Sequence, residues 1–327
     1  SGWQDLFLEQ TITQYRHLRD RGVDVAMTIG PWTHTDMATK AAGPAAAETL
    51  TWLGSHLARR PMPQRPSRVR AYVGHHGWVN LPDWPPATDE GAMYLQPGGR
   101  LTAAPPPADA APSTFRYDPA HPTPTVGGRL LARLSGYRDD SALAQRSDVL
   151  AFTSGPLDAD LYVCGNPVVE LAHESDIDHF DVFVRVSEVD GRGRSRNVSD
   201  GYRRFTAAPE GPVRLELDAI AHRFRAGTRI RVLVAGGSHP RFARNLGTGE
   251  PVISGRRMVP SVHTVHHGAG GVSKLVLPAS ADPPSADGFR GEDVNGERWR
   301  IYSTIDPAAG VAISVAEPVR ERQEVIW

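Results

Sequence analysis

The chain has 327 residues, of which 40% are hydrophobic and 22% charged, and its 32 glycines and 28 prolines fit a turn-rich folded protein rather than a disordered one. Its 36 basic and 37 acidic residues leave a net charge of -1, so no overall field draws it to nucleic acid or to an anionic membrane. The single cysteine, Cys164, excludes an intramolecular disulfide and a multi-thiolate metal site, and no apolar run approaches the roughly 20 residues of a membrane span.

The first part of the chain carries helical and strand patterns in turn. Apolar residues recur at three- and four-residue steps from Leu6 to Arg19, which predicts an amphipathic helix. Alternation from Val23 to Ile29 predicts a short strand, and the turn residues Gly30-Pro31 are expected to end it. A second helix is expected from about Pro44 to Leu57. Three leucines share one face of that helix: Leu50, Leu53 and Leu57.

Beyond Pro66 the helical periodicity gives way to short β-rich runs bounded by Gly, Pro, Asp and Asn. The predicted strands are Val69–Val73, Leu161–Val163, Val168–Ala172, Phe180–Val189, Val213–Leu217, Ile230–Ala235 and Lys274–Leu277. Several short strands with turn signals between them predict a mostly β protein, an antiparallel β-sandwich or jelly roll.

The last part of the chain differs again in composition. Residues 280–288 are rich in Ser, Ala, Asp and Pro, as in a linker. Two strands are expected after it, at Trp299–Ser303 and Val311–Val315, and no function is assigned to them.

One pair of residues points to chemistry. Asp5 lies just before the first predicted helix, and His34 lies in the loop after the first predicted strand. A histidine after a strand, with a carboxylate on an earlier strand-end loop, is the arrangement by which α/β-hydrolases orient their general base. On spacing alone, the plainer alternative is that both residues cap the helices that follow them. Asp36 would compete with Asp5 as the partner of His34, although capping fits it better.

Other polar residues give weaker signals. His75 and His76 are expected in a turn, and His263, His266 and His267 are expected on a surface or half-buried strand rather than at a metal. Asp176, Asp178, His179 and Asp181 form an acidic cluster that matches no calcium-binding loop, so we expect a solvated loop there.

Motifs along most of the chain carry a family resemblance. The segments Gly2-Trp3-Gln4-Asp5-Leu6-Phe7 and Ile29-Gly30-Pro31-Trp32-Thr33-His34 resemble the Asp and His motifs of the cocaine esterase and X-prolyl dipeptidyl aminopeptidase family of serine hydrolases. Further landmarks resemble the C-terminal jelly roll of that family: Leu81–Pro86, Tyr117–Pro119, Val149–Leu157, Gly193–Gly201, Ala221–Gly227 and Pro240–Asn245.

The resemblance implies a bacterial hydrolase that divides acyl-transfer chemistry among Ser, His and Asp. His34 would then be the general base and Asp5 the residue that orients it. The sequence contains no Gly-x-Ser-x-Gly elbow, so the serine is expected upstream of this chain, and the chain alone is expected to be inactive. The implied partner is a small-molecule ester or peptide substrate, with neither a metal nor an organic cofactor.

The resemblance also divides the chain. Residues 1–62 would be the last αβα part of an α/β-hydrolase domain, 63–278 a galactose-binding-like jelly roll, and 279–327 a linker and an extra tail of unknown role. A cytoplasmic location is expected, no nucleic acid or membrane is expected as partner, and self-association into a homo-oligomer is left open. The competing function is that of a non-catalytic carbohydrate- or ligand-binding β-sandwich module.

Overall fold

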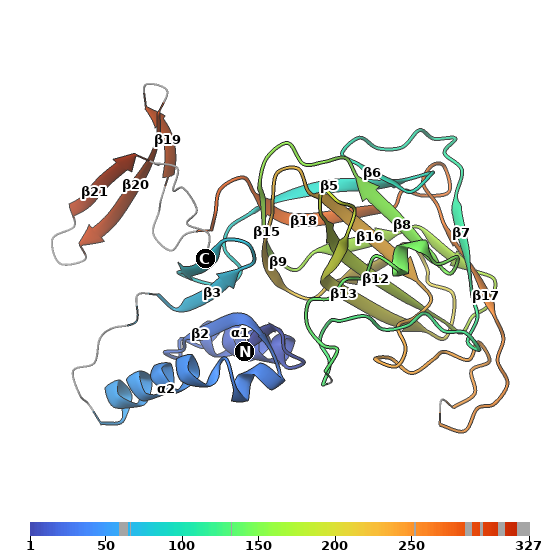
Figure 1. Cartoon of the computed structure of the whole chain (residues 1–327), viewed down its shortest axis with the longest axis horizontal. Coiled ribbons are helices and arrows are strands. Elements are labelled where there is room, and N and C mark those ends of the chain that lie inside the picture. The colour runs from blue at the N-terminus through green and yellow to red at the C-terminus, as the bar shows by residue number, and fades with distance from the viewer. Residues whose placement is uncertain are drawn as a thin grey trace.

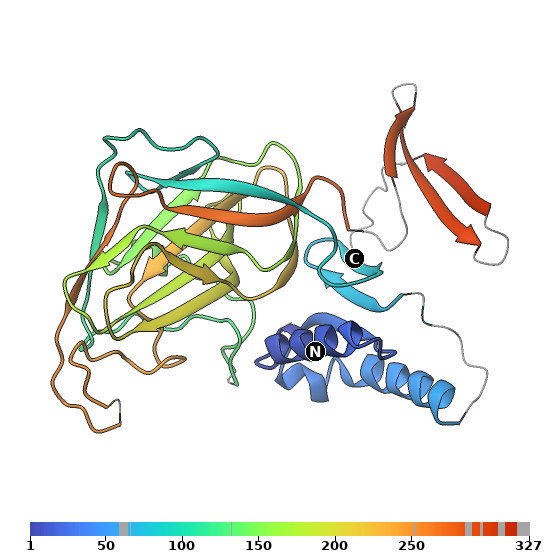
Figure 2. The same ribbon diagram turned by 180° about the vertical axis from the view of Figure 1, so that it is seen from behind.

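A computed structural model describes residues 1–58, 65, 67–131, 133–251 and 253–284 in full, and the backbone of 290–294, 297–306 and 311–318. It shows a small N-terminal α/β segment beside a large β-rich part, and both views show the two side by side (Figures 1 and 2). The prediction of a mostly β chain with a short α/β segment at its N-terminus is confirmed. Neither helix in the described part is long and apolar enough to cross a membrane.

The N-terminal segment is built on a four-stranded sheet in the order β1-β2-β3-β4. Its strands are β1 (Gly2–Gln4), β2 (Met27–Thr33), β3 (Val69–Val73) and β4 (Gly77–Leu81). The first three strands are parallel and β4 returns antiparallel to β3. The carboxyl ends of β1, β2 and β3 therefore meet at one edge of the sheet, where ligand sites of α/β sheets usually lie.

Strand β2 corrects one expectation from the sequence. It begins at Met27, later than predicted, and continues through Gly30-Pro31 to Thr33 instead of ending there. Its pairing with β3 covers only Met27 to Ile29, so the missing N–H of Pro31 costs no hydrogen bond on that side. A Cβ at Gly30 would lie 2.4 Å from the Trp32 ring, which explains why this position is glycine.

The two helices differ in how much of their apolar face is covered. Helix α1 (Leu8–Asp20) confirms the first predicted helix and buries Leu8, Ile12 and Tyr15. Helix α2 (Ala42–His56) confirms the second but buries no residue. Leu50 is 69% exposed, so the predicted apolar face of α2 is uncovered by the described part of this chain. A short 3-10 turn, η1 (Thr35–Ala38), joins β2 to α2.

The β-rich part, residues 89–280, is called the β body below. Its main sheet has eleven strands, in the order β13-β12-β16-β8-β6-β5-β18-β10-β14, with β9 and β15 attached through β18. The strands are β5 (Asp89–Gln96), β6 (Arg100–Thr102), β8 (Val149–Ser154), β9 (Leu161–Gly165), β10 (Val168–Leu171), β12 (Phe180–Val189), β13 (Ser195–Phe205), β14 (Val213–Glu216), β15 (Ile220–Phe224), β16 (Arg229–Ala235) and β18 (Lys274–Ser280). The sequence predicted antiparallel strands, but β6 and β8 pair in parallel, so the sheet is mixed. The sheet is also nearly closed (Figure 1).

Smaller sheets complete the chain. Strands β7 (Ser113–Tyr117), β11 (His173–Ser175) and β17 (Ser261–Val265) form a three-stranded sheet at one end of the β body. Strands β19 (Arg290–Val294), β20 (Glu297–Asp306) and β21 (Val311–Pro318) form another, which confirms the two strands expected near the C-terminus.

The core of the β body follows from strand alternation. Every residue of β12 is buried, and the strand pairs with β13 on one side and β16 on the other. Its valines Val182, Val184 and Val186 join the main apolar cluster. Arg185 lies between them in sequence and is also fully buried, so the opposite face must supply partners for a charge.

Candidate functional site

The fold brings Asp5 and His34 together at the carboxyl-end edge of the N-terminal sheet. Asp5 follows β1 and His34 follows β2, and the register places Gln4 opposite Thr33. The distance from His34 Nδ1 to Asp5 Oδ1 is 3.0 Å. A carboxylate can only accept, so the shared proton lies on Nδ1, and Nε2 of a neutral ring keeps a free lone pair for proton transfer.

Asp5 is held firmly. Its side chain is 5% exposed, its Oδ1 also accepts the Phe7 N–H at 3.0 Å, and its Oδ2 accepts the Ser1 hydroxyl at 3.3 Å. The Phe7 N–H lies just ahead of α1, and the N-terminus of this helix has no side-chain cap, so Asp5 closes the turn before the helix. The plainer alternative, in which Asp5 and His34 cap the helices that follow them, is therefore wrong, because the short helix after His34 also has no side-chain cap.

His34 is more open than its partner. Its side chain is 34% exposed, and the Phe7 ring meets it edge-on at 5.2 Å between centroids. The competing carboxylate, Asp36, points elsewhere. Its Oδ2 accepts the N–H and the hydroxyl of Thr33 at 3.0 and 2.8 Å, and its Oδ1 lies 2.9 Å from Lys40 Nζ. Asp36 is thus bonded to Thr33, the last residue of β2, and to Lys40.

A loop of the β body, described at residues 127–131 and 133–138, lies against the residues that precede the pair. A Cβ on Gly136 would be 3.0 Å from Thr33 Cγ2, beside His34. Tyr137 hydrogen-bonds Gln4, beside Asp5, and burial raises the pKa of Tyr137 to about 12. Figure 1 shows this green loop descending from the β body beside the N-terminal segment. The β body therefore supports both strand ends at which the pair stands.

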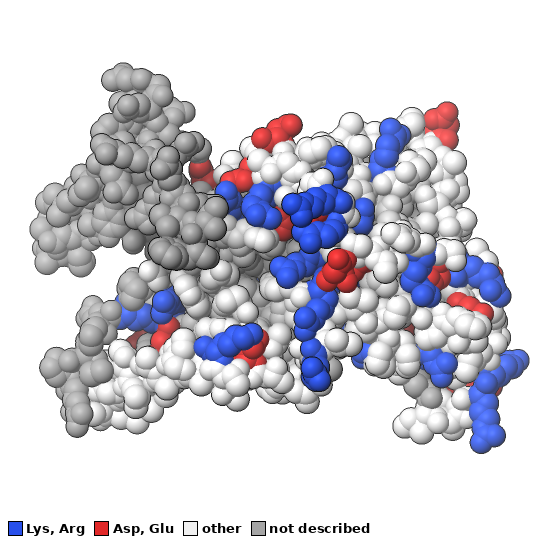
Figure 3. Space-filling view, viewed as in Figure 1, with Lys and Arg blue, Asp and Glu red and all other residues white. Residues whose placement is uncertain are grey.

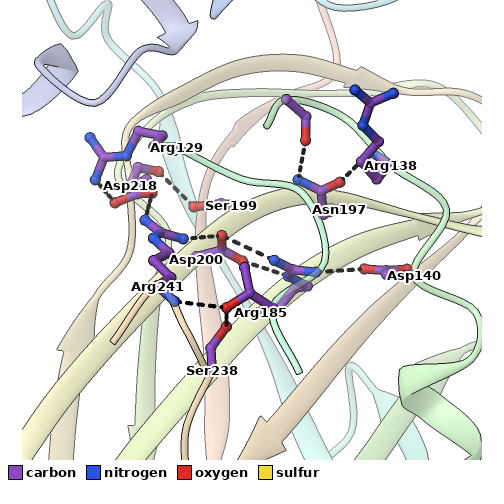
Figure 4. Close-up of polar contacts among 12 residues, drawn as sticks. Arg129, Arg138, Asp140, Arg185, Asn197, Ser199, Asp200, Asp218, Ser238 and Arg241 are labelled. Carbon is purple, nitrogen blue, oxygen red and sulfur yellow. Dashed lines mark hydrogen bonds and ion pairs between the residues drawn. The ribbon is translucent and has the colours of Figure 1, made fainter. Parts of the chain in front are cut away.

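A buried ionic network supports this loop from within the β body (Figure 4). Arg129 of the loop pairs with Asp218 and lies 3.4 Å from Glu9 on α1. Glu9 Oε1 also accepts the Ala219 N–H at 3.1 Å. The contacts of Glu9 with Arg129 and Ala219 therefore attach α1 to the β body near the N-terminus of the helix.

The centre of this network is fully enclosed. Arg185 donates to both oxygens of Asp200, at 2.6 and 3.2 Å, and Arg241 donates to Asp200 Oδ2 at 2.6 Å. Burial acts to raise the pKa of Asp200, but the two guanidinium groups outweigh it and hold that pKa below its usual value. Asp140 lies 3.5 Å from Arg185 and supplies a second carboxylate. The cluster therefore balances its charges within the β body.

The remaining sequence signals divide into two kinds. His75 lies in a turn, as expected, and has a φ of 61°. His263 is fully buried, not on a surface, and bonds His173 and Ser261. The expected acidic cluster does not form one solvated loop, because Asp181 is buried against Arg204 while Asp176 accepts the Val262 N–H.

The described surface carries both charge signs. On the face seen in Figure 3, basic and acidic side chains lie interspersed. A cavity of about 850 Å³ lies between α2 and strands β3 and β4, and neither Asp5 nor His34 lines it. Its lining includes Trp52, His56 and Trp78. The candidate site is therefore defined by the pair and its supporting loop, not by this cavity.

Comparison with known proteins agrees with this architecture. The chain is 27% identical to the cocaine esterase of Rhodococcus sp. (strain MB1 Bresler) over 318 residues, covering 85% of this chain and 55% of that protein. An aminopeptidase from a Thaumarchaeota archaeon shares the fold with a TM-score of 0.75 at 23% identity, covering 85% of this chain and 54% of that one. An α-amino acid ester hydrolase does so with a TM-score of 0.73 at 22% identity, with the same two coverages. The chain thus spans about half the length of these proteins.

These findings identify the class of protein to which the chain belongs, the CocE/NonD family. Residues 62–276, about two thirds of the chain, match the model of the X-Pro dipeptidyl-peptidase C-terminal non-catalytic domain. The chain belongs to that family.

Sequence reasoning identified the pair but missed what surrounds it. No local pattern in the sequence marked Tyr137, Arg129 or Glu9. Each of them contacts a residue that lies more than a hundred positions away in the chain. The two glycines at 127 and 128, both with positive φ, mark a sharp turn at the start of the loop and were the one local hint.

Proposed function

We propose that Asp5 and His34 are the acid and the general base of a Ser-His-Asp hydrolase, with a serine supplied by a part of the protein outside this sequence. The observation that carries the proposal is the 3.0 Å contact between His34 Nδ1 and Asp5 Oδ1, with the ring one third exposed. In this proposal residues 1–62 are the last αβα part of an α/β-hydrolase domain, 63–278 are a jelly roll, and 279–327 are a linker and tail.

The proposed mechanism is acyl transfer. His34 Nε2 would take the serine proton as the hydroxyl attacks the carbonyl carbon, and would return it to the leaving group. Asp5 would remain ionised, hold the Nδ1–H tautomer and stabilise the imidazolium that forms. The enclosed carboxylate suits this role because its second donor, the Phe7 N–H, fixes its orientation toward the ring.

The proposed substrates are acyl esters or X-prolyl amides. Support comes from the similar proteins, which include an esterase, an aminopeptidase and an α-amino acid ester hydrolase. The chemistry assigned to Asp5 and His34 is the same for an ester and an amide, so these residues do not choose between them. By this proposal the chain supplies two of the three catalytic groups and is inactive alone.

The proposal is tested in the full-length hydrolase with a generic activated acyl ester. His34→Ala should lower kcat by roughly 10⁴-fold or more, because proton transfer is lost, while the folded circular dichroism spectrum is kept. His121→Ala is the matched control. His121 also stands beside an aspartate, with Nδ1 3.5 Å from Asp118 Oδ2, but it is 85% exposed on the β body and should leave kcat unchanged.

Retention of activity within tenfold by a folded His34→Ala enzyme would contradict the proposal. The alternative function, a carbohydrate- or ligand-binding module, is favoured by one finding, the non-catalytic description of the matched domain. That alternative requires a full-length protein without a Gly-x-Ser-x-Gly elbow and without hydrolysis of the ester.

A further inference from the structure

A second cluster of histidine and carboxylate stands where the N-terminal sheet meets the β body. His75 follows β3, Glu188 lies on β12, and His222 lies on β15. The Nε2 atoms of both histidines lie 3.0 Å from the same oxygen, Glu188 Oε2. A turn and two strands therefore supply one possible ligand atom each, and these three atoms lie within 4.8 Å of one another.

The backbone builds this convergence. Gly74 bridges His222, donating to the Ala221 carbonyl at 2.9 Å and accepting the Arg223 N–H at 2.9 Å. A Cβ at Gly74 would lie 2.6 Å from His222 Nδ1, so only glycine permits the approach. His75 then takes a φ of 61°, which turns its side chain toward Glu188. Left-handed backbone is costly for histidine, and such strain often accompanies functional sites.

The cluster is enclosed on one side and open on the other. The side chains of Glu188 and His222 are each 7% exposed, and that of His75 is 29% exposed. A cavity of about 310 Å³ reaches His75 and Glu188, and its lining carries both charge signs, with Asp139 and Asp190 beside Arg194, Arg196 and Arg225. Among the described residues, Glu188 Oε1 has no hydrogen-bond partner despite being buried. A carboxylate in this state has unused ligand capacity facing a cavity that an ion could enter.

We propose that His75, Glu188 and His222 bind a divalent transition-metal ion of the zinc class through the two Nε2 atoms and a Glu188 oxygen. Two imidazoles and one carboxylate are a ligand set of zinc sites that keep a fourth position open. With metal–ligand bonds of 2.0–2.2 Å, tetrahedral ligand atoms stand about 3.3 Å apart. The two observed 3.0 Å separations therefore need to open by only a few tenths of an ångström.

Coordination would rearrange protons without a net change. Because a carboxylate only accepts, each Nε2 donates its hydrogen to Glu188 in the structure; on coordination the Nε2 lone pair would go to the metal and the Nε2 proton to Nδ1 of the same ring. Arg225 opposes the ion, because its Nε lies 4.0 Å from Glu188 Oε1. Its side chain is 50% exposed and reaches water, so it can turn away when the ion enters.

An ion at this point would fasten two parts of the molecule. His75 belongs to the turn after β3, and β3 pairs with β2, the strand that ends just before His34. Glu188 and His222 belong to the β body. Since binding to the folded state alone adds RT ln(1 + [L]/Kd) to stability, an ion present at a hundredfold excess over its Kd would strengthen the chain measurably.

The test is calorimetric titration of the chelator-treated chain with zinc chloride, with cobalt(II) absorption as a report on coordination. His75→Asn removes the imidazole and keeps a residue that tolerates the left-handed turn. We expect one zinc per chain, at least tenfold weaker binding in His75→Asn, and unchanged binding in the adjacent control His76→Asn. Glu188→Gln should also abolish the tetrahedral cobalt spectrum, and Arg225→Gln should tighten zinc binding.

Thermal unfolding gives an independent readout. Zinc should raise the Tm of the wild type and of His76→Asn, and should not raise that of His75→Asn. The proposal is overturned if zinc does not bind, or if it binds equally well to His75→Asn, which would show that the three side chains form a hydrogen-bonded structural cluster only. No arm depends on catalytic activity, so failure here is distinct from failure of the proposed hydrolase.

Discussion

The N-terminal segment and the β body use histidine in opposite ways. His34 stands at a sheet edge, one third exposed, with an aspartate 3.0 Å away. His263 is fully buried and bonds only the neutral groups His173 and Ser261, at 3.0 and 2.8 Å. Burial lowers the pKa of His263 to about 3 and that of His173 to about 4. Burial without a carboxylate partner thus favours the neutral imidazole of His263 and His173, whereas His34 at the sheet edge has both a carboxylate partner and access to solvent.

Carboxylates follow the same division. Asp5 bonds the His34 ring, which is partly exposed to solvent, and both residues lie at the edge of the N-terminal sheet. Asp200 lies inside the β body between two guanidinium groups and has no part in any open site. The ionic network around Asp200 therefore serves the cohesion of the β body and its attachment to α1, while the pair at the sheet edge includes a ring that is one third exposed.

The largest effect should come from breaking the enclosed network. Arg185→Met removes the guanidinium charge that pairs with the buried carboxylates of Asp200 and Asp140. The variant should therefore lower the free energy of unfolding by about 3–5 kcal/mol. Urea unfolding of the chain measures this. Arg194→Met is the control, because Arg194 pairs with Asp190 at 2.9 Å but is 66% exposed, and its loss should cost less than about 1 kcal/mol. Equal costs for the two variants would erase the distinction between the regions.

The sequence predicted the parts of the fold that bury apolar faces. Strand β12 appears with the predicted bounds, because its valines alternate and its whole length is apolar or flanked by apolar residues. Its neighbour β13 was not predicted as a strand, since Asn197, Ser199 and Asp200 give it a polar pattern. These polar side chains can be buried because they form hydrogen bonds with residues distant in sequence. For example, the Arg138 N–H donates to Asn197 Oδ1 at 2.6 Å. Such pairing is a property of the fold and leaves no local pattern.

The same limit applies to the candidate sites. Asp5 and His34 each follow a strand, so local pattern and spacing could identify them. His75, Glu188 and His222 come together across 113 and 34 positions, from a turn and two strands of the β body. Only the topology that stacks the two sheets brings them within bonding distance.

A moderate effect should appear when the pH is lowered. The folded-state pKa of His263 lies below its ordinary value, so the unfolded chain binds the proton more readily and stability falls as the pH drops below about 6.5. At pH 5 this one group should cost about 2 kcal/mol relative to pH 8. The carboxylates with lowered pKa values, Asp200 and Glu188, lose their contribution only at more acidic pH, which leaves this window to the buried histidines.

Urea unfolding of the wild type and of His263→Gln at a series of pH values measures this effect. The variant is less stable at pH 8 because packing changes, but its stability should fall less steeply between pH 7 and pH 5. Parallel curves for the two proteins would show that the pKa of His263 is the same in the folded and the unfolded chain, and would contradict the prediction.

The smallest effect should come from Asp36, and it sharpens the assignment of the sheet edge. Asp36→Asn loses the ion pair with Lys40, whose side chain is 75% exposed, but the amide oxygen can still accept from the Thr33 N–H and hydroxyl. Solvent screens such a pair, so the free energy of unfolding should change by less than about 1 kcal/mol. In the full-length hydrolase kcat should stay within about twofold of wild type, whereas Asp5→Asn should lower it by roughly 10⁴-fold through the wrong ring tautomer. Comparable losses in kcat for the two variants would mean that His34 turns toward Asp36 during the reaction, and that the pair at the sheet edge is less fixed than its 3.0 Å contact implies.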